Sequence, residues 1–168
     1  MILYSGHITP KWKVDDYLNL SYKQATIHNT FLDQYIIDGH NNDQIQIFNY
    51  FEPAPMPSSV EYIRSHFKDL ECLSVAVNLM LPGQYLPHHR DLYERWLDFH
   101  KLTDVDKVYR AIVMLSDSSP GQILQIENDS IGFWKAGDWF AWTGNASHAV
   151  YNFSTGPRYA IQITGYLK

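Results

Sequence analysis

The 168-residue chain contains a single cysteine, Cys72, so no disulfide can form within it. A lone cysteine is typical of proteins from a reducing compartment, and we expect a cytoplasmic protein. No stretch approaches the roughly 20 consecutive apolar residues of a membrane span. Residues 1–13 lack the basic start and the apolar run of a signal peptide. The sequence therefore predicts no association with a membrane.

An excess of basic residues is also missing, because 13 Lys and Arg face 18 Asp and Glu, for a formal net charge of −5. Proteins that bind a phosphate backbone depend on clustered Lys and Arg, so we expect no nucleic-acid partner. Hydrophobic residues make up 45% of the chain and charged residues 18%, which is typical of a folded globular protein. The length predicts one domain, residues 1–168.

Short apolar runs separated by turn residues fill the chain from residue 72 onward. Aromatic residues reach 15%, and flat or branched side chains pack well on a pleated sheet. Gly, Pro, Asn and Ser separate the runs, which favours a closed or double-sheet β architecture. The predicted strands are residues 73–81, 85–91, 108–115, 122–127, 138–143, 146–153 and 158–166. They predict a mainly β fold with a jelly-roll core over residues 72–168.

Residues 1–71 are expected to form an α/β cover on that core. Residues 45–51 alternate loosely between apolar and polar side chains, which indicates a strand. Ser58 lies three residues before Glu61, and apolar residues then recur at helical spacing. We therefore predict an amphipathic helix over residues 58–69. Residues 92–102 form either a helix or another ordered excursion between two strands.

His89 and Asp91 lie two residues apart in a predicted strand, so their side chains point to the same face. The adjacent His88 points to the opposite face. One His from a distant strand completes a facial set of two imidazoles and one carboxylate, which leaves three metal positions open. His148 is the best candidate, because it lies at the start of a strand just after a turn at residues 144–145. Neutral imidazole and a hard carboxylate suit Fe2+.

Arg158 lies ten residues after His148, at the start of the last predicted strand. A hairpin would place the two residues on neighbouring antiparallel strands. An Arg that faces into a small barrel is costly unless an anion pairs with it. A bound dicarboxylate supplies such an anion through charge-assisted hydrogen bonds. The alternative is a surface Arg that pairs with an acidic neighbour.

The order His89-Arg90-Asp91, then His148, then Arg158 resembles the Fe(II)- and 2-oxoglutarate-dependent dioxygenase superfamily. The resemblance covers about the last three-fifths of the chain. It is closest to the small prolyl- and aspartyl-hydroxylase-like enzymes of bacteria and phages. It implies a double-stranded β-helix, or cupin-like, core.

The same resemblance implies that His89, Asp91 and His148 bind Fe2+, and that 2-oxoglutarate and O2 are cosubstrates. Arg158 would pair with the distal carboxylate of 2-oxoglutarate. The expected reaction is hydroxylation of a C–H bond, with release of succinate and CO2. The resemblance favours an amino acid, a peptide or a protein side chain as the substrate.

Further residues are candidates for the same site. Tyr85 shares the predicted strand face of the metal pair, so it either lines the cofactor pocket or packs in the core. Arg110 is either a second anion contact or an edge charge. Asn152 lies on the same predicted face as the distal metal ligand and is a candidate hydrogen-bond partner near it. Tyr93 and Trp96 are expected to contact substrate, because the loop that leaves a metal site is well placed to act as a lid.

Two other functions fit the same residues. A cupin-type metalloenzyme without a keto-acid cosubstrate usually presents more His ligands in a Gly-rich motif, whereas no His follows His89 until His100. That alternative also leaves Arg158 without a role. A non-catalytic jelly-roll binding module would tolerate the loss of a ligand, and all three are present. The sequence leaves the primary substrate and the oligomeric state open.

Overall fold

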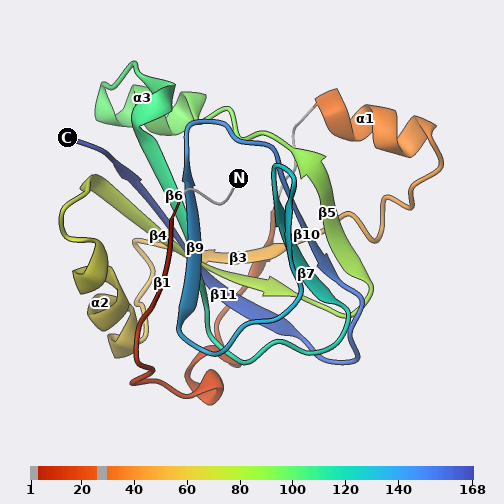
Figure 1. Cartoon of the computed structure of the whole chain (residues 1–168), viewed down its shortest axis with the longest axis horizontal. Coiled ribbons are helices and arrows are strands. Elements are labelled where there is room, and N and C mark those ends of the chain that lie inside the picture. The colour runs from red at the N-terminus through yellow and green to blue at the C-terminus, as the bar shows by residue number, and fades with distance from the viewer. Residues whose placement is uncertain (1–3, 26–29) are drawn as a thin grey trace.

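Two antiparallel sheets that face each other form the framework of the fold (Figure 1). The computed structural model describes residues 4–25 and 30–168. One sheet has seven strands in the order β1-β9-β6-β11-β4-β3-β2, and the other has four in the order β5-β10-β7-β8. The arrangement is a double-stranded β-helix, so the predicted fold class, mainly β with a jelly-roll core, is confirmed.

The strands of the large sheet come from both ends of the chain. They are β1 (Tyr4–His7), β2 (Lys23–Gln24), β3 (Phe48–Phe51), β4 (Glu71–Met80), β6 (Val108–Met114), β9 (Asp138–Thr143) and β11 (Arg158–Tyr166). The small sheet consists of β5 (Gln84–His89), β7 (Gln122–Ile126), β8 (Asp129–Ile131) and β10 (His148–Asn152). Every strand predicted after residue 72 forms, with each end within two residues of its predicted place.

β6 lies near the centre of the large sheet, and every one of its residues is buried. Ala111 and Val113 share a core cluster with residues of α2 (Ser58–Arg64), which covers the outer face of the sheet. Ile112 and Met114 belong to a second cluster, with residues of β7, between the two sheets. A strand covered on both faces is expected to be an almost continuous apolar run. The one charged residue in this strand, Arg110, therefore needs a specific partner.

The first 71 residues do more than cover the core, because three of their strands extend the large sheet. β1 pairs with β9 and β3 pairs with β4, so N-terminal strands lie toward both edges of the sheet. The predicted helix forms as α2 followed by a 3-10 turn at Ser65–Phe67, and its apolar face is buried. The strand predicted over residues 45–51 begins only at Phe48.

Two further helices lie beside the small sheet and the chain that leaves it (Figure 1). α1 (Thr30–Ile37) is close to β5, and α3 (Glu94–His100) occupies the excursion that follows β5. The sequence did not predict β8, because residues 128–129 look like a turn and three residues are too few to show alternation. Among the described residues, no helix is both long and apolar enough to cross a membrane.

Candidate metal centre and its cavity

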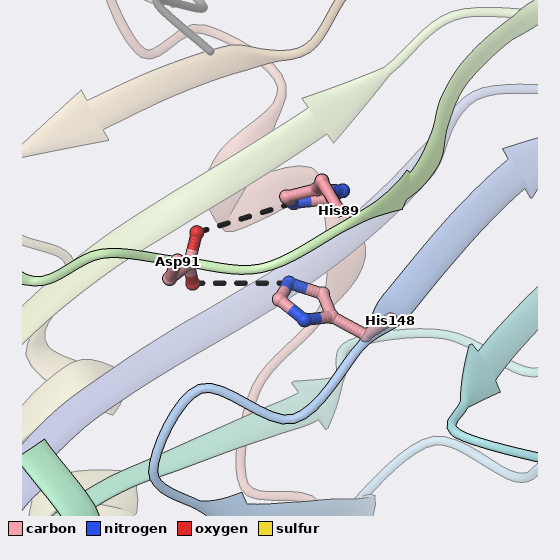
Figure 2. A group of neighbouring side chains, drawn as sticks. All are labelled: His89, Asp91 and His148. Atoms are coloured by element: carbon pink, nitrogen blue, oxygen red, sulfur yellow. Dashed lines mark ion pairs between the residues drawn. The ribbon is translucent and has the colours of Figure 1, made fainter. Parts of the chain in front are cut away.

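Three side chains, two from neighbouring strands and one from the segment after β5, gather at one end of the small sheet (Figure 2). His89 ends β5, His148 begins β10, and the two residues are direct partners in the antiparallel ladder. Asp91 lies two residues beyond the end of β5, outside the strand in which the sequence placed it. One ligand atom from each residue lies within 4.8 Å of the other two. The structure thus brings together the three predicted ligands as a group that could hold a metal ion.

Backbone carbonyls fix the orientation of both imidazole rings. His89 Nδ1 lies 2.7 Å from the carbonyl oxygen of Pro87, and His148 Nδ1 lies 2.9 Å from that of Ala146. A carbonyl oxygen only accepts, so each Nδ1 must carry the proton and donate. The Nε2 atom of each ring is therefore left as a lone-pair donor. Metal-binding His residues are commonly oriented in this way.

The gap between the rings and the carboxylate fits a cation. His89 Nε2 lies 3.9 Å from Asp91 Oδ1, and His148 Nε2 lies 3.7 Å from Asp91 Oδ2 (Figure 2). Both separations are too long for a hydrogen bond, and in the neutral tautomer neither Nε2 carries a hydrogen to donate. Two lone pairs and a carboxylate facing one another repel unless a positive charge lies between them. The donor set of two imidazoles and one carboxylate therefore fits a divalent metal.

The pKa values of Asp91 and His148 favour the protonation states in which these residues can bind a metal. Burial raises the pKa of Asp91, but the positive charge of Arg110, together with His148 and His89, outweighs burial and leaves that pKa below its usual range. Burial, reinforced by the neighbouring His89, lowers the pKa of His148 to about 4. At neutral pH the carboxylate is thus ionised and His148 is neutral, which are the protonation states that metal ligands need.

Arg110 contacts the candidate ligand Asp91 directly. Its Nη2 lies 3.0 Å from Asp91 Oδ2, and its guanidinium lies over the ring of Tyr93, 5.0 Å from the centroid. The sequence had left Arg110 as a second anion contact or an edge charge. Arg110 is not at an edge of the sheet. Its ion-pair partner, Asp91, is part of the protein, so Arg110 is not left to bind the anion of a ligand. Its place in the middle of β6 explains why it is buried.

A cavity of about 330 Å³ opens from the metal centre into the space between the two sheets. Arg158 lines this cavity together with the three candidate ligands. Its side chain is only 4% exposed, and burial lowers its pKa to about 10. The described partners are weak, namely Met114 Sδ at 3.5 Å from Nη2 and the ring of Trp134 at 5.6 Å, while Nε has none. Among the described residues no carboxylate lies within ion-pair distance of Arg158.

Tyr85 does not line the cavity, which corrects the prediction from strand alternation. β5 pairs His89 with His148 but Leu86 with Val150, so two residues of β5 lie opposite one residue of β10. This bulge places His89 and Leu86 on the cavity side and moves Tyr85 to the other face. There the Tyr85 hydroxyl bonds His40 Nδ1 at 2.9 Å, and its ring stacks on another tyrosine.

Asn152 is also absent from the lining of the cavity. It lies at the opposite end of β10 from His148 and is fully buried. Its Nδ2 donates to the carbonyl oxygens of Met80 and Gly156, at 2.8 and 3.0 Å, and its Oδ1 accepts from Ser154. Asn152 therefore stabilises the turn between β10 and β11 and is not a partner of the metal ligands.

Neither of the two predicted substrate contacts lines the cavity. Trp96 lies on α3 and donates its indole N–H to Ser74 Oγ at 3.0 Å, so it packs α3 onto the large sheet. Tyr93 is 8% exposed and packs under Arg110, beside the metal centre but not in the lining. The residues of this loop that do line the cavity are Arg90 and Leu92, and Leu92 is 54% exposed.

Sequence reasoning missed a group of polar residues that line the cavity, namely Asn49, Asn78 and Gln162. One signal was present, because Asn78 interrupts the apolar run of β4 and is 4% exposed. Asn49 lies on β3, which was assigned to the N-terminal cover. Its place beside β4 depends on a pairing that no local pattern reveals.

No protein-family model matches the chain, and none of the curated proteins matches it. Several solved structures are similar. A prolyl-4-hydroxylase from Pseudomonas putida is 14% identical with a TM-score of 0.55, over 92% of this chain and 97% of that chain. A predicted oxalate decarboxylase from Thermotoga maritima is 11% identical with a TM-score of 0.45, over 73% and 82% of the two chains. A cupin protein from Bacteroides fragilis is 17% identical with a TM-score of 0.40, over 56% and 65%. At such identities the likeness to the hydroxylase shows the fold alone.

Proposed function

We propose that the protein is an Fe(II)- and 2-oxoglutarate-dependent dioxygenase that hydroxylates a C–H bond and releases succinate and CO2. The observation that carries the proposal is Arg158, a buried cation without a carboxylate partner among the described residues. It lines the same cavity as a His-Asp-His group that could hold a metal ion. A buried unpaired charge is costly, so the cavity favours an anionic ligand that reaches Arg158.

The charge balance of the cavity favours a dianion. Asp91 is the one acidic residue in the lining, and Arg110 already neutralises it. Arg90 also lines the cavity, although it is exposed, so a divalent metal and Arg158 leave a positive excess in the buried part even when Arg90 is not counted. 2-Oxoglutarate carries two carboxylates. One would pair with the Arg158 guanidinium and the other would lie at the metal. The guanidinium would bind a carboxylate through charge-assisted hydrogen bonds.

The chain's part in the reaction follows from its contacts. His89, Asp91 and His148 would hold Fe2+, which together with 2-oxoglutarate and O2 supplies the oxidative decarboxylation that drives hydroxylation. The carbonyls of Pro87 and Ala146 keep both rings oriented. A position between the two sheets would keep water away from the cosubstrate and would hold the substrate C–H bond in a fixed direction.

The proposed substrate is an amino acid, a peptide or a protein side chain, and not a nucleic acid. The net charge of −5 opposes a phosphate backbone. The segment that leaves the metal centre, residues 92–107, mixes acidic and basic side chains and offers no basic track. The test is succinate formation, above the uncoupled background, with amino-acid and peptide pools and with single- and double-stranded DNA. Stimulation by DNA alone, with an oxidised base found by mass spectrometry, would overturn this substrate class.

Anaerobic titration with Fe2+ and 2-oxoglutarate tests the proposed chemistry. An oxygenase should develop a weak visible charge-transfer band only when both are present. A cupin-type metalloenzyme without a keto acid would bind metal but show no such band, and a binding module would bind no metal. The Arg158→Ala variant should need a much higher concentration of 2-oxoglutarate to reach the same band. Absence of the band in the wild-type protein would rule the proposal out.

A further inference from the structure

Three carboxamide side chains form one wall of the cavity. Asn49 lies on β3, Asn78 on β4 and Gln162 on β11, and these strands are adjacent in the large sheet. Asn49 and Asn78 are direct partners across the ladder, and Ala160, the partner of Asn78, lies two residues before Gln162 on β11. We call these three residues the amide wall. Asn49 and Asn78 lie on the side of β11 away from Arg110 and β6, whereas Gln162 lies on β11 itself and pairs with Ile112 of β6.

The amide wall keeps most of its hydrogen-bonding capacity unused. Asn78 Nδ2 donates to Asn49 Oδ1 at 2.7 Å, and no other hydrogen bond to either side chain is formed among the described residues. Each primary amide offers an NH2 group and a carbonyl oxygen, so the pair still presents one carbonyl and one NH2 group. If the O and N atoms of both side-chain amides are exchanged, one carbonyl oxygen and one NH2 group still remain unbonded. The carboxamide of Gln162 makes no hydrogen bond with any described residue.

Such a pair matches a third amide. A carbonyl and an NH2 group side by side complement the N–H and C=O of another amide, whereas a carboxylate would meet the carbonyl lone pairs. Asn78 is 96% buried, so its unused oxygen would stay unsatisfied unless a ligand or a water reaches it. The charged ligand groups already have partners in Arg158 and the metal ligands. The uncharged wall is thus available for the other substrate.

We infer that the amide wall binds an amide group of the primary substrate, either a peptide bond or a side-chain carboxamide. The inference rests on the proposed function and narrows its substrate class to neutral, amide-bearing molecules. Ile47, Leu86 and Val150 also line the cavity and would contact an apolar body attached to that amide. The volume of about 330 Å³ is near the lower end of the roughly 300–1,000 Å³ of ligand pockets. Beside 2-oxoglutarate, it admits a group about the size of one residue.

Calorimetric titration with small probes tests the inference without turnover. The full chain is loaded with Fe2+ and 2-oxoglutarate under anaerobic conditions and titrated with isovaleramide, methyl isovalerate or isovalerate. These probes share one apolar body and differ only in the head group. Isovaleramide should bind about tenfold or more tightly than the ester and the acid, because the loss of one buried hydrogen bond corresponds to roughly a factor of ten.

Matched variants locate the effect. Gln162→Leu and Asn49→Leu should each weaken isovaleramide about tenfold. Gln125→Leu is the control, because Gln125 is also a half-buried strand residue but bonds Ser130 and His88 outside the cavity. Equal binding of amide and ester, no binding of the amide by the wild type, or equal effects of Gln162→Leu and Gln125→Leu would overturn the inference.

A third result would reassign the wall to the cosubstrate. If Gln162→Leu and Asn49→Leu weaken the charge-transfer band while isovaleramide affinity is unchanged, these carboxamides bind 2-oxoglutarate and the inference is wrong. Failure of the proposed function is distinguishable, because the wild-type protein would then show no band before any probe is added. In that case the amide-wall inference would also be wrong, because it rests on the proposed function.

Discussion

Two buried arginines line the same cavity, and their surroundings differ in one respect. Arg110 has its anion in place, with Asp91 at 3.0 Å, and although burial opposes its charge, Tyr93 and Asp91 outweigh burial and raise its pKa. Among the described residues, the contacts of the Arg158 guanidinium are with a thioether and an indole ring, and burial lowers its pKa to about 10. The two residues lie on adjacent strands, β6 and β11.

The difference separates two uses of a buried cation. Arg110 acts within the protein, where it keeps the Asp91 carboxylate ionised and in place beside the two imidazoles. Arg158 has no acidic partner in residues 4–25 and 30–168, so its charge is available to a ligand. Position inside a barrel does not by itself mark an anion-binding arginine. The marker is a buried guanidinium whose partners among the protein's own residues are all uncharged.

The largest expected effect comes from removing one of the two imidazoles that face Asp91, the carboxylate partner of Arg110. His89→Ala should abolish both Fe2+ binding and turnover while the fold is retained, because the metal loses one of three ligands. His88→Ala is the control, since His88 bonds Gln125 and Ser147 on the outer face. Metal content after anaerobic loading and succinate release are the measurements. Near-normal activity of His89→Ala would mean that the wrong histidine was assigned. The role of Arg110 beside a metal ligand would then have no support.

Replacing each arginine with Met in the metal-free protein should change stability in opposite directions. Arg110→Met leaves the Asp91 carboxylate without its cation and should cost about 3 kcal/mol of unfolding free energy. Arg158→Met removes an unpaired buried charge and should stabilise the protein by about 1 kcal/mol. Urea denaturation in a chelating buffer measures both. Equal destabilisation by the two variants would erase the distinction between them.

2-Oxoglutarate affinity should depend on Arg158 more than on Arg110. Arg158→Ala removes a charge-assisted contact worth about 1.5–3 kcal/mol, so the dissociation constant should rise by one to two orders of magnitude. Arg158→Lys should recover only part of the loss, because the planar fork is absent. The charge-transfer band reports the affinity. An unchanged dissociation constant in Arg158→Ala would move the role to another residue, with Arg110 next in line.

The last prediction concerns pH and tests the metal centre beside Arg110. The pKa of His148 falls from 6.5 to about 4 on folding, so below pH 6.5 the unfolded chain takes up a proton that the folded chain does not. The contribution of His148 to the unfolding free energy of the metal-free protein should therefore be complete above pH 6.5. The unfolding free energy should fall by about 2 kcal/mol by pH 5. The lowered pKa of Asp91 acts in the same direction at lower pH. His148→Gln should show a shallower loss in urea denaturation at pH 7 and pH 5. Parallel curves for the two proteins would contradict this origin.

The parts of the site that could be predicted are those encoded by short-range patterns. The spacing of His89 and Asp91 depends on neighbouring residues alone. The hairpin predicted between the strands of His148 and Arg158 does not form, because β10 pairs with β5 and β7 in the small sheet while β11 pairs with β4 and β6 in the large sheet. Arg158 therefore reaches the cavity from the opposite sheet. Strand alternation failed at Tyr85, because the bulge at residues 87–88 reverses the faces of β5. Pro87 was the one local signal of the bulge, because a proline within a strand has no N–H for the ladder and is confined to edges and bulges.

The residues that could not be predicted depend on long-range pairing. Asn49 reaches the cavity only because β3 joins the large sheet beside β4, across 29 residues of sequence. Trp96 was expected at the substrate and instead packs on Ser74, because the orientation of α3 is set by the sheet beneath it. Arg110 was visible as a charge in an apolar run, but its partner came from the loop after a different strand. Sequence patterns thus predict elements and nearby ligands but not their partners in the fold.

The carbonyls that orient the two imidazoles have a consequence for how the protein can evolve. Each ring donates to the backbone two residues before it, at Pro87 for one and Ala146 for the other. A carbonyl is present whatever side chain occupies the position, so no single substitution at either residue deletes the acceptor. Random mutation near the two histidines can therefore alter side chains extensively while the rings keep their tautomer and direction. To keep each imidazole in place, evolution must conserve only the histidine itself and the local course of its backbone.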